Sequence, residues 1–180
     1  MSEAIRIPLS RGLFTVVDGE DYADHIKGCG VNGGDAKWYA AGRTCGFYAA
    51  RGVRIECGGR KEIVYLHRLI VGAAPGLEVD HINGDTLDNR RSNLRVCTRA
   101  ENARNLAKRP GGSSRFKGVS RAKADRVWRA FIRVDGRQIS LGSFRVEREA
   151  ARAYDDAAIR EFGEFARTNF PVDAPARRSA

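Results

Sequence analysis

The residues best suited to chemistry lie in the stretch 79–105. Asp80 and His81 stand together at the end of a short apolar run, and Asn102 follows later in the same stretch. A carboxylate and an amide oxygen are hard ligands of the kind that Mg²⁺ prefers, and a neutral imidazole can take a proton from water. Each residue alone is a weak signal, since a lone Asp-His pair usually marks a solvated turn. Together they suit phosphodiester hydrolysis, in which a cation holds the phosphate and stabilises the departing oxygen.

The sequence around these residues predicts a strand, a loop, a second strand and a helix. A polar, turn-rich loop covers 83–93, and a second apolar run covers 94–97. Thr98 and Glu101 have the spacing of a capping box, so we expect a helix to begin there with Asn102 in its first turn. This order of elements would bring the three chemically suited side chains to the same end of one small motif.

The stretch resembles the HNH endonuclease family, in the variant whose third motif residue is Asn, as in homing enzymes of phage introns. The resemblance rests on VDHINGDTLDNRRSNLR at 79–95 and on Asn102. It implies a ββα-metal module in which His81 is the general base and in which Asp80 and Asn102 bind one Mg²⁺ or Mn²⁺ ion. It also implies that Asn93 braces the loop by hydrogen bonds.

A preceding segment, YLHRLI at 65–70, is similar to a VHRLV-like segment of the same family, and His67 matches its histidine. His67 lies in an amphipathic run, so a structural role and a role at the site, such as contacting phosphate, both remain open. Apolar residues at mixed helical spacing cover 61–70, and Ala-Ala-Pro-Gly at 73–76 closes this element.

The chain is basic as a whole and around this site. Its formal net charge is +10, which favours a polyanionic partner such as double-stranded DNA or, alternatively, only aids solubility. After Asp88 only Glu101 opposes the local arginines in the sequence, so we expect them to hold DNA phosphates; the alternative is a solvated basic face. These arginines are Arg90, Arg91, Arg95, Arg99 and Arg104.

Residues 1–60 are interpreted as a β-rich N-terminal region. We expect short strands and one short helix there, at 5–9, 13–17, 21–26, 38–40 and 47–49. Acidic residues cluster at 18–24, but acids at a turn and at a helix start are ordinary, so we reject a metal site in this cluster. The stretch 9–22 is similar to the start of many nucleases of this HNH type, where it would support the site or touch the DNA backbone.

The segment LAKRPGGSS at 106–114 marks a boundary, and we interpret 107–113 as a short, flexible, basic linker. The pattern after it predicts a three-stranded antiparallel sheet with an Asp-Gly hairpin turn, followed by one helix that ends at Gly163. These elements are expected at 116–119, 127–134, 137–144 and 147–162. The tail at 172–180 is expected to be disordered.

The middle strand of this sheet has two different faces. Trp128 and the residues that alternate with it form an apolar face, and the alanine-rich helix should cover that face because small side chains permit close approach. Arg129, Phe131 and Arg133 then lie on an open face. An exposed basic face with an aromatic residue is a plausible surface for a DNA groove.

The segment 114–171 resembles the plant ethylene-response-factor (ERF, Apetala-type) DNA-binding domain. The resemblance rests on FKGVS, WRAFIRV, LGSF, EAARAYDDAA and a closing Asn-Phe-Pro. In that family the sheet lies in the major groove, which implicates five residues in DNA binding: Lys117, Arg129, Arg133, Gln138 and Ser140. Ser120, Phe131, Ser140 and Val146 depart from the plant pattern, so the fold is transferred and the plant base preference is not.

The four cysteines are widely spaced without a CxxC pair, which argues against structural zinc and fits reduced thiols. The N-terminus has no signal-peptide layout and no stretch is long and apolar enough to span a membrane. We therefore expect a soluble protein, without a membrane partner, in the cytoplasm of a bacterial or phage-infected cell. A single nuclease site per chain favours a monomer.

The sequence thus predicts an α+β protein that acts as a homing-like DNA endonuclease, nicking one strand or cutting both. A nuclease module at 61–106 would cut, and the domain at 114–171 would recognise the DNA. Two alternatives stay open. One is a DNA-binding transcription regulator with an inactive HNH module, and the other is a nuclease that acts on RNA.

Overall fold

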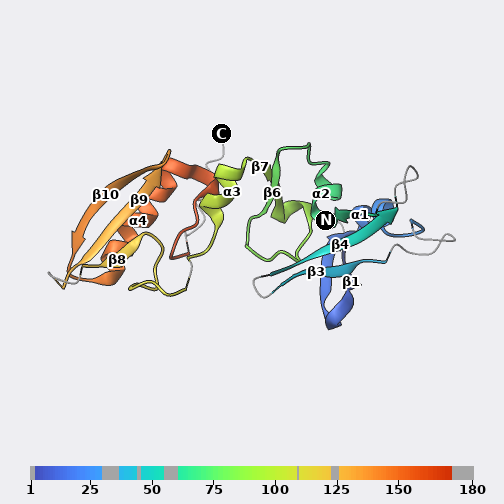
Figure 1. Cartoon of the computed structure of the whole chain (residues 1–180), viewed down its shortest axis with the longest axis horizontal. Helices are drawn as coiled ribbons and strands as arrows, with labels where there is room; N and C mark the ends of the chain where they lie inside the picture. Colours follow the sequence, from blue (N-terminus) through green and yellow to red (C-terminus); the bar gives the residue numbers. More distant parts are fainter. Residues whose placement is uncertain are drawn as a thin grey trace. The chain divides into compact units, whose positions relative to one another are not determined.

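The structure, a computed structural model, describes residues 3–29, 37–43, 46–54, 61–108, 110–122 and 126–171. Contacts between Cα atoms divide the chain into two compact units, Met1–Asn102 and Ala103–Ala180. Both combine antiparallel β-sheet with short segments of helix or a single longer one, so the chain has mixed α/β character (Figure 1). The tail at 172–180 lies outside the described residues. Among the helices that are described, none is both long and apolar enough to cross a membrane.

The first unit contains three small antiparallel sheets, pairing β1 with β2, β6 with β7, and β4 with both β3 and β5. Its elements are β1 (Ala4–Pro8), β2 (Phe14–Asp18), α1 (Gly19–His25), β3 (Tyr39–Arg43), β4 (Gly46–Arg54), β5 (Lys61–Tyr65), α2 (Leu66–Val71), β6 (Glu78–His81), β7 (Leu94–Cys97) and the first residues of α3 (Arg99–Asn105). The strands and the helix predicted for the N-terminal region are all present, most of them within two residues of the predicted bounds.

One element predicted for the first unit differs from the structure. The mixed helical spacing over 61–70 suggested a single element, but Lys61–Tyr65 is strand β5, paired with β4, and helix α2 begins only at Leu66. The first half carries the β-branched residues Ile63 and Val64, which favour an extended chain next to the long strand β4. His67 therefore lies in the first turn of a six-residue helix.

Strand β2 ties the N-terminal region to the loop between β6 and β7. The backbone N–H of Val16 donates to the carbonyl of Leu87 at 2.9 Å, and the N–H of Asn89 donates to the carbonyl of Val16 at 2.8 Å. Val16 and Asp88 thus form a parallel bridge. Along β2 the side chains alternate, with Thr15 and Val17 fully buried and Phe14 exposed. Val17 joins the apolar core, whereas Thr15 brings a hydroxyl into the interior beside the loop.

The second unit is a three-stranded antiparallel sheet with one long helix. The sheet has the order β10-β9-β8, built from β8 (Val119–Arg121), β9 (Trp128–Val134) and β10 (Arg137–Phe144), and the helix is α4 (Glu147–Phe162). Asp135 and Gly136 have φ values of 48° and 78°, as a two-residue type I′ hairpin requires. The hairpin and the helix with its end at Gly163 are as predicted. The first strand begins at Val119, three residues later than expected.

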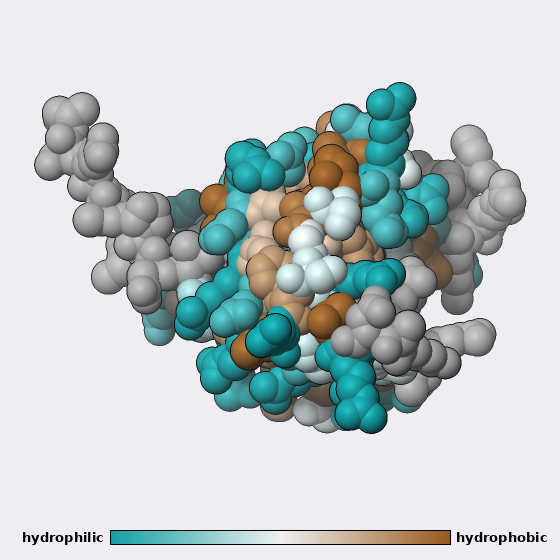
Figure 2. All heavy atoms as spheres, turned by 90° about the vertical axis from the view of Figure 1, so that its left-hand side faces the viewer, coloured by the Kyte–Doolittle hydropathy of each residue, from teal (hydrophilic) through white to brown (hydrophobic). Residues whose placement is uncertain are grey.

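Helix α4 packs on the face of β9 that was predicted to be covered. Ala130 clusters with Ala150 and Ala151, and Ile132 clusters with residues one and two turns further along the helix, Tyr154 and Ala158. The alanines let the helix approach the sheet, and the opposite face of β9 is left uncovered by α4 (Figure 1). Figure 2 faces this unit and shows hydrophilic side chains around a paler band of weakly polar and apolar ones.

Candidate active site and nucleic-acid interface

His81 is the last residue of β6 and its side chain is buried. Its Nε2 lies 3.1 Å from Oδ1 of Asn89. Burial lowers the pKa of His81 below its ordinary value of 6.5, although the hydrogen bond with Asn89 and the carboxylate of Asp80 act in the opposite direction. The imidazole is therefore neutral at neutral pH, which is the state that a general base needs.

A second histidine packs against this one. The ring of His67 lies 5.3 Å from the ring of His81, measured between centroids, and Tyr48 packs against both. Burial, followed by the nearby His81, lowers the pKa of His67 to about 3. Its buried Nδ1 has no hydrogen-bond partner within the described part of the chain. His67 is thus a neutral group that cannot attract phosphate by charge, although a ring N–H can still donate to an oxygen.

Asn102 lies in the first turn of α3 and turns its side chain toward β6. Its Nδ2 donates to Oε2 of Glu78 at 2.6 Å. A carboxylate can only accept, so the amide orientation is fixed and the amide oxygen, the atom that would bind a cation, points away from Glu78. Glu78 and Asp80 lie two residues apart and share one face of β6, so Asn102 approaches the face that carries Asp80. The capping box that positions this turn is formed, with Glu101 and Thr98 bonded reciprocally.

Asp80 faces Arg95 across the β6–β7 pair. Arg95 donates from Nε and Nη2 to Oδ2 of Asp80, at 2.9 and 2.6 Å. Both side chains are largely buried, with exposed fractions of 5% for Asp80 and 11% for Arg95. This guanidinium was expected to hold a DNA phosphate, but it is directed at the carboxylate instead. A cation bound at Asp80 would share that carboxylate with Arg95.

The donor set for a metal is small. No group of three or more His, Cys, Asp or Glu side chains that could hold a metal occurs among the described residues. The predicted pair of one carboxylate and one amide oxygen is not such a group. It fits Mg²⁺ in chemistry, because this ion binds hard oxygen atoms through few protein ligands and completes its shell with water and substrate phosphate. A cavity of about 270 Å³ beside Asn102 is lined by Tyr48, Tyr65, His67, Glu78 and Asn102, among others.

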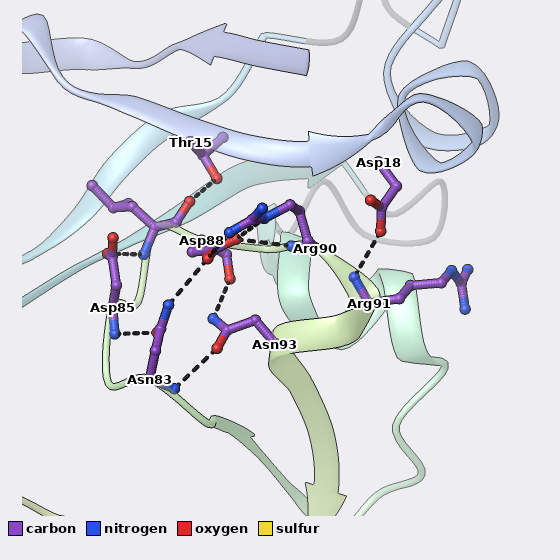
Figure 3. Close-up of polar contacts among 9 residues, drawn as sticks. Thr15, Asp18, Asn83, Asp85, Asp88, Arg90, Arg91 and Asn93 are labelled. Atoms are coloured by element: carbon purple, nitrogen blue, oxygen red, sulfur yellow. Dashed lines mark hydrogen bonds and ion pairs between the residues drawn. The ribbon is translucent and has the colours of Figure 1, made fainter. Parts of the chain in front are cut away.

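The loop between β6 and β7 is braced by its own polar side chains (Figure 3). Asn93 accepts from the backbone N–H of Asn83 at 3.0 Å and donates to the carbonyl of Asp88 at 2.8 Å. Asn83 and Asp85 each accept a backbone N–H two residues further on, which are Asx turns. Asn93 thus links both ends of the loop that follows His81.

The local arginines have more opposing charge than the neighbouring sequence suggested. Arg90 donates from Nε and Nη2 to the two carboxylate oxygens of Asp88, and this contact is the main reason that the pKa of Asp88 is lowered. Arg91 donates from Nε and Nη2 to Asp21, which is 1% exposed. The backbone N–H of Arg91 donates to Asp18 (Figure 3). Asp21 of α1, separated from Arg91 by seventy residues, is the counter-charge that the local sequence does not show. Both guanidiniums are about half exposed.

The predicted DNA-binding residues of the second unit fall into two groups. Arg129, Arg133, Gln138 and Ser140 are exposed on β9 and β10, and the register pairs Gln138 with Arg133. Lys117 is different, because its Nζ donates to the carbonyls of Arg104 and Leu106 and burial lowers its pKa to about 8. Arg104, also predicted to hold phosphate, lies over the ring of Phe162 and 4.0 Å from Asp135.

Three residues near the site were not anticipated from the sequence. Asn89 and Thr15 are fully buried and bonded to each other, and Asn89 contacts the imidazole of His81. Glu78 orients Asn102. A polar residue at an inward position of β2 was a signal for Thr15, because a buried hydroxyl requires partners. Asn89 lies inside the HNH-like stretch, yet its role depends on Thr15, which is seventy-four residues away.

Comparisons with known proteins give matches of two kinds. A family model described as HNH endonuclease matches residues 64–104. An uncharacterized HNH endonuclease, L560, of Acanthamoeba polyphaga mimivirus is 34% identical over 107 residues, which cover 58% of this chain and 54% of that protein. Protein 3.8 of Escherichia phage T7 is 32% identical over 68 residues, covering 38% of this chain and 56% of that one.

A second group of relatives consists of plant transcription factors. The APETALA2-like protein 2 of rice is 51% identical over 61 residues, which cover 33% of this chain and 14% of that protein. The chain thus spans about half the length of the mimivirus and phage relatives and a small part of the plant ones. It combines a segment that matches HNH endonucleases with a segment similar to AP2-like transcription factors.

Proposed function

We propose that this chain is a metal-dependent DNA endonuclease that hydrolyses phosphodiester bonds, with His81 as the general base. The observation that carries the proposal is the buried, neutral imidazole of His81, held by Asn89 and adjoining Asp80 within the HNH-matching segment. A regulator that only binds DNA has no need of a neutral, oriented histidine beside a carboxylate and an amide.

In the proposed reaction, the imidazole of His81 takes a proton from a water molecule, and the oxygen of that water forms a bond to phosphorus. The P–O bond on the opposite side breaks, and the departing oxygen takes a proton from solvent. A divalent cation such as Mg²⁺ or Mn²⁺, held by Asp80 and Asn102, would stabilise the charge on the departing oxygen. Asn93 acts on this step by keeping the loop after His81 in place.

The second unit would supply recognition. Phosphate contacts position a protein on DNA but do not specify sequence, so the exposed side chains Arg129, Arg133, Gln138 and Ser140 are the proposed readers of the target. Two linked modules gain affinity through effective concentration, so neither has to bind tightly alone. We leave Lys117 and Arg95 out of the DNA surface, because their charged groups are bound within the protein. One site per chain favours nicking by a monomer.

A second candidate is a DNA-binding regulator with an inactive HNH module. The ion pair between Asp80 and Arg95 favours it, because a carboxylate that already has a counter-charge has less need of a cation. Incubation of supercoiled plasmid with the full chain and Mg²⁺ or Mn²⁺ distinguishes the two. Wild type should nick the plasmid, EDTA should stop the reaction, and His81→Ala should abolish nicking while plasmid binding persists. No product with either metal, across several plasmids, would favour the regulator.

A further inference from the structure

Strand β2 reaches the proposed base through a directional chain of hydrogen bonds. The hydroxyl of Thr15 donates to the carbonyl of Leu87 at 2.8 Å, and Nδ2 of Asn89 donates to Oγ1 of Thr15 at 2.6 Å. Oδ1 of Asn89 then lies 3.1 Å from Nε2 of His81. Thr15 and Asn89 both have 0% of their surface exposed, so water does not substitute for these contacts.

The backbone carbonyl of Leu87, at one end of this series of hydrogen bonds, fixes the direction of all the others. The carbonyl of Leu87 can only accept, so the single hydroxyl proton of Thr15 points to it. Oγ1 must therefore accept from the amide nitrogen of Asn89, since an amide oxygen in that place would face another oxygen with no proton between them. The amide oxygen is left facing His81, and two acceptors cannot bond. Nε2 of His81 must carry the proton.

We infer that Thr15 and Asn89 are positioning residues that hold His81 in the tautomer with the proton on Nε2, which leaves the lone pair on Nδ1 as the basic site for the attacking water. Proton transfer then breaks the water O–H bond, forms the Nδ1–H bond and leaves the electron pair on the oxygen that attacks phosphorus. The inference assigns a role to strand β2, which carries Thr15. Its statement about the tautomer stands alone, and only its statement about catalysis rests on the proposed function.

The tautomer can be measured without DNA. The chain has three histidines, so long-range ¹H–¹⁵N spectra of the ring nitrogens of the full-length protein contain three sets of signals, and His81→Gln identifies the set that belongs to His81. We expect a pyrrole-type Nε2 and a pyridine-type Nδ1 at His81 in the wild type. A wild-type imidazole with its proton on Nδ1 would overturn the inference, whether or not any variant folds.

Two threonines offer a matched pair of variants. Thr15→Val keeps the shape and removes the hydroxyl, which frees the Asn89 amide to turn over. Thr86→Val also removes a loop-anchoring hydroxyl, which donates to the carbonyl of Phe47 at 2.6 Å, but this bond does not lead to the imidazole. We expect Thr15→Val to populate the Nδ1–H tautomer and to lower kcat for plasmid nicking about tenfold, with KM unchanged. Thr86→Val and Thr15→Ser should keep the wild-type tautomer and rate.

The outcomes separate this inference from the proposed function. An unchanged His81 tautomer in a folded Thr15→Val protein would overturn the inference, as would a shifted tautomer with unchanged kcat. If His81 carries its proton on Nε2 but the protein cleaves no DNA, the nuclease proposal is wrong and the positioning of the imidazole by Thr15 and Asn89 is still supported. If Thr15→Val and Thr86→Val lower the rate equally, Thr15 only holds the loop in place and does not position the imidazole, which would also overturn the inference.

Discussion

Arg95 directs two N–H groups at a single carboxylate oxygen of Asp80, with Nη2 at 2.6 Å and Nε at 2.9 Å. The two residues face each other across β6 and β7, and both are largely buried. The proposed metal ligand therefore has a built-in counter-charge. In the absence of a cation, Arg95 balances the charge of the buried carboxylate, and a cation would have to share Asp80 with it.

This arrangement makes the stability of an Arg95 variant depend on metal. Arg95→Met keeps the length of the side chain and removes the charge that lies against the buried Asp80, so the free energy of unfolding should fall by about 3 kcal/mol without metal. Because a bound cation replaces the lost charge, saturating Mg²⁺ should restore much of the difference. Urea unfolding of wild type and variant with EDTA or with Mg²⁺ measures this.

Arg91→Met is the control for that prediction. Arg91 also pairs with a buried acid, Asp21, but neither belongs to the proposed metal site. Its side chain is 54% exposed, so the expected loss is smaller, about 1 kcal/mol, and should be the same with and without Mg²⁺. Equal responses of the two variants to Mg²⁺ would argue against a cation at Asp80.

A pH dependence of stability follows from His67. Its pKa falls from 6.5 to about 3 on folding, so the unfolded chain binds a proton that the folded chain does not. The contribution of neutral His67 to the free energy of unfolding is fully present above pH 6.5. It is lost as the pH falls from 6.5 toward 3, by at most about 1.4 kcal/mol per pH unit. The stability difference between wild type and His67→Gln should therefore shrink as the pH is lowered from 7.5 to 4. The carboxylates titrate in both proteins, so their effect on stability cancels when the variant is subtracted from the wild type. A difference that stays constant with pH would contradict the prediction.

The sequence predicted the parts of this protein that local interactions decide. The Asp135–Gly136 turn, the end of α4 at Gly163 and the capping box of Thr98 and Glu101 each depend on a few neighbouring residues, and each is present. The alternation of apolar and polar residues along β9 correctly predicted which face of the strand is buried, because successive side chains of a strand point to opposite faces.

Contacts between distant segments escaped prediction. Arg91 finds Asp21 across seventy residues, and Asn89 finds Thr15 across seventy-four, so neither local spacing nor local charge balance reveals them. For this reason the acidic partner of Arg91 was not expected. Lys117 belongs to a motif that is similar to part of a DNA-binding domain. Its ammonium nevertheless donates to two backbone carbonyls, a contact that tertiary packing sets.

Gly118 is a stability determinant of the second unit. A Cβ added to it would lie 1.9 Å from the ring of Tyr154 on α4, and its φ of 72° disfavours other residues. Gly118→Ala should lower the free energy of unfolding by about 3 kcal/mol, as overpacking and strain act together. Gly136→Ala is the control, since its φ is 78° but nothing lies near its Cβ, so about 1 kcal/mol is expected. Urea unfolding followed by NMR amide signals of β9 compares them.

The exposed face of β9 should determine which DNA site is cut. Arg133 is exposed and pairs in register with Gln138, so its guanidinium can reach a base edge or a phosphate. Arg133→Ala should lower the preference for the target over random DNA by about tenfold or more while non-specific nicking continues, because a base contact contributes about 1–3 kcal/mol of discrimination. Sequencing of cleavage products from a random duplex library measures the preference directly.

Lys117→Met separates recognition from folding in the same experiment. The Lys117 ammonium is bound to two backbone carbonyls, so its removal should lower the stability of the second unit and leave the sequence preference of the folded protein intact. The two variants should therefore give opposite results, with altered preference at normal stability for Arg133→Ala and normal preference at lower stability for Lys117→Met. If Lys117→Met relaxes the preference and Arg133→Ala does not, the side of the sheet that meets DNA is the one near Lys117, and the open face of β9 is not the reader.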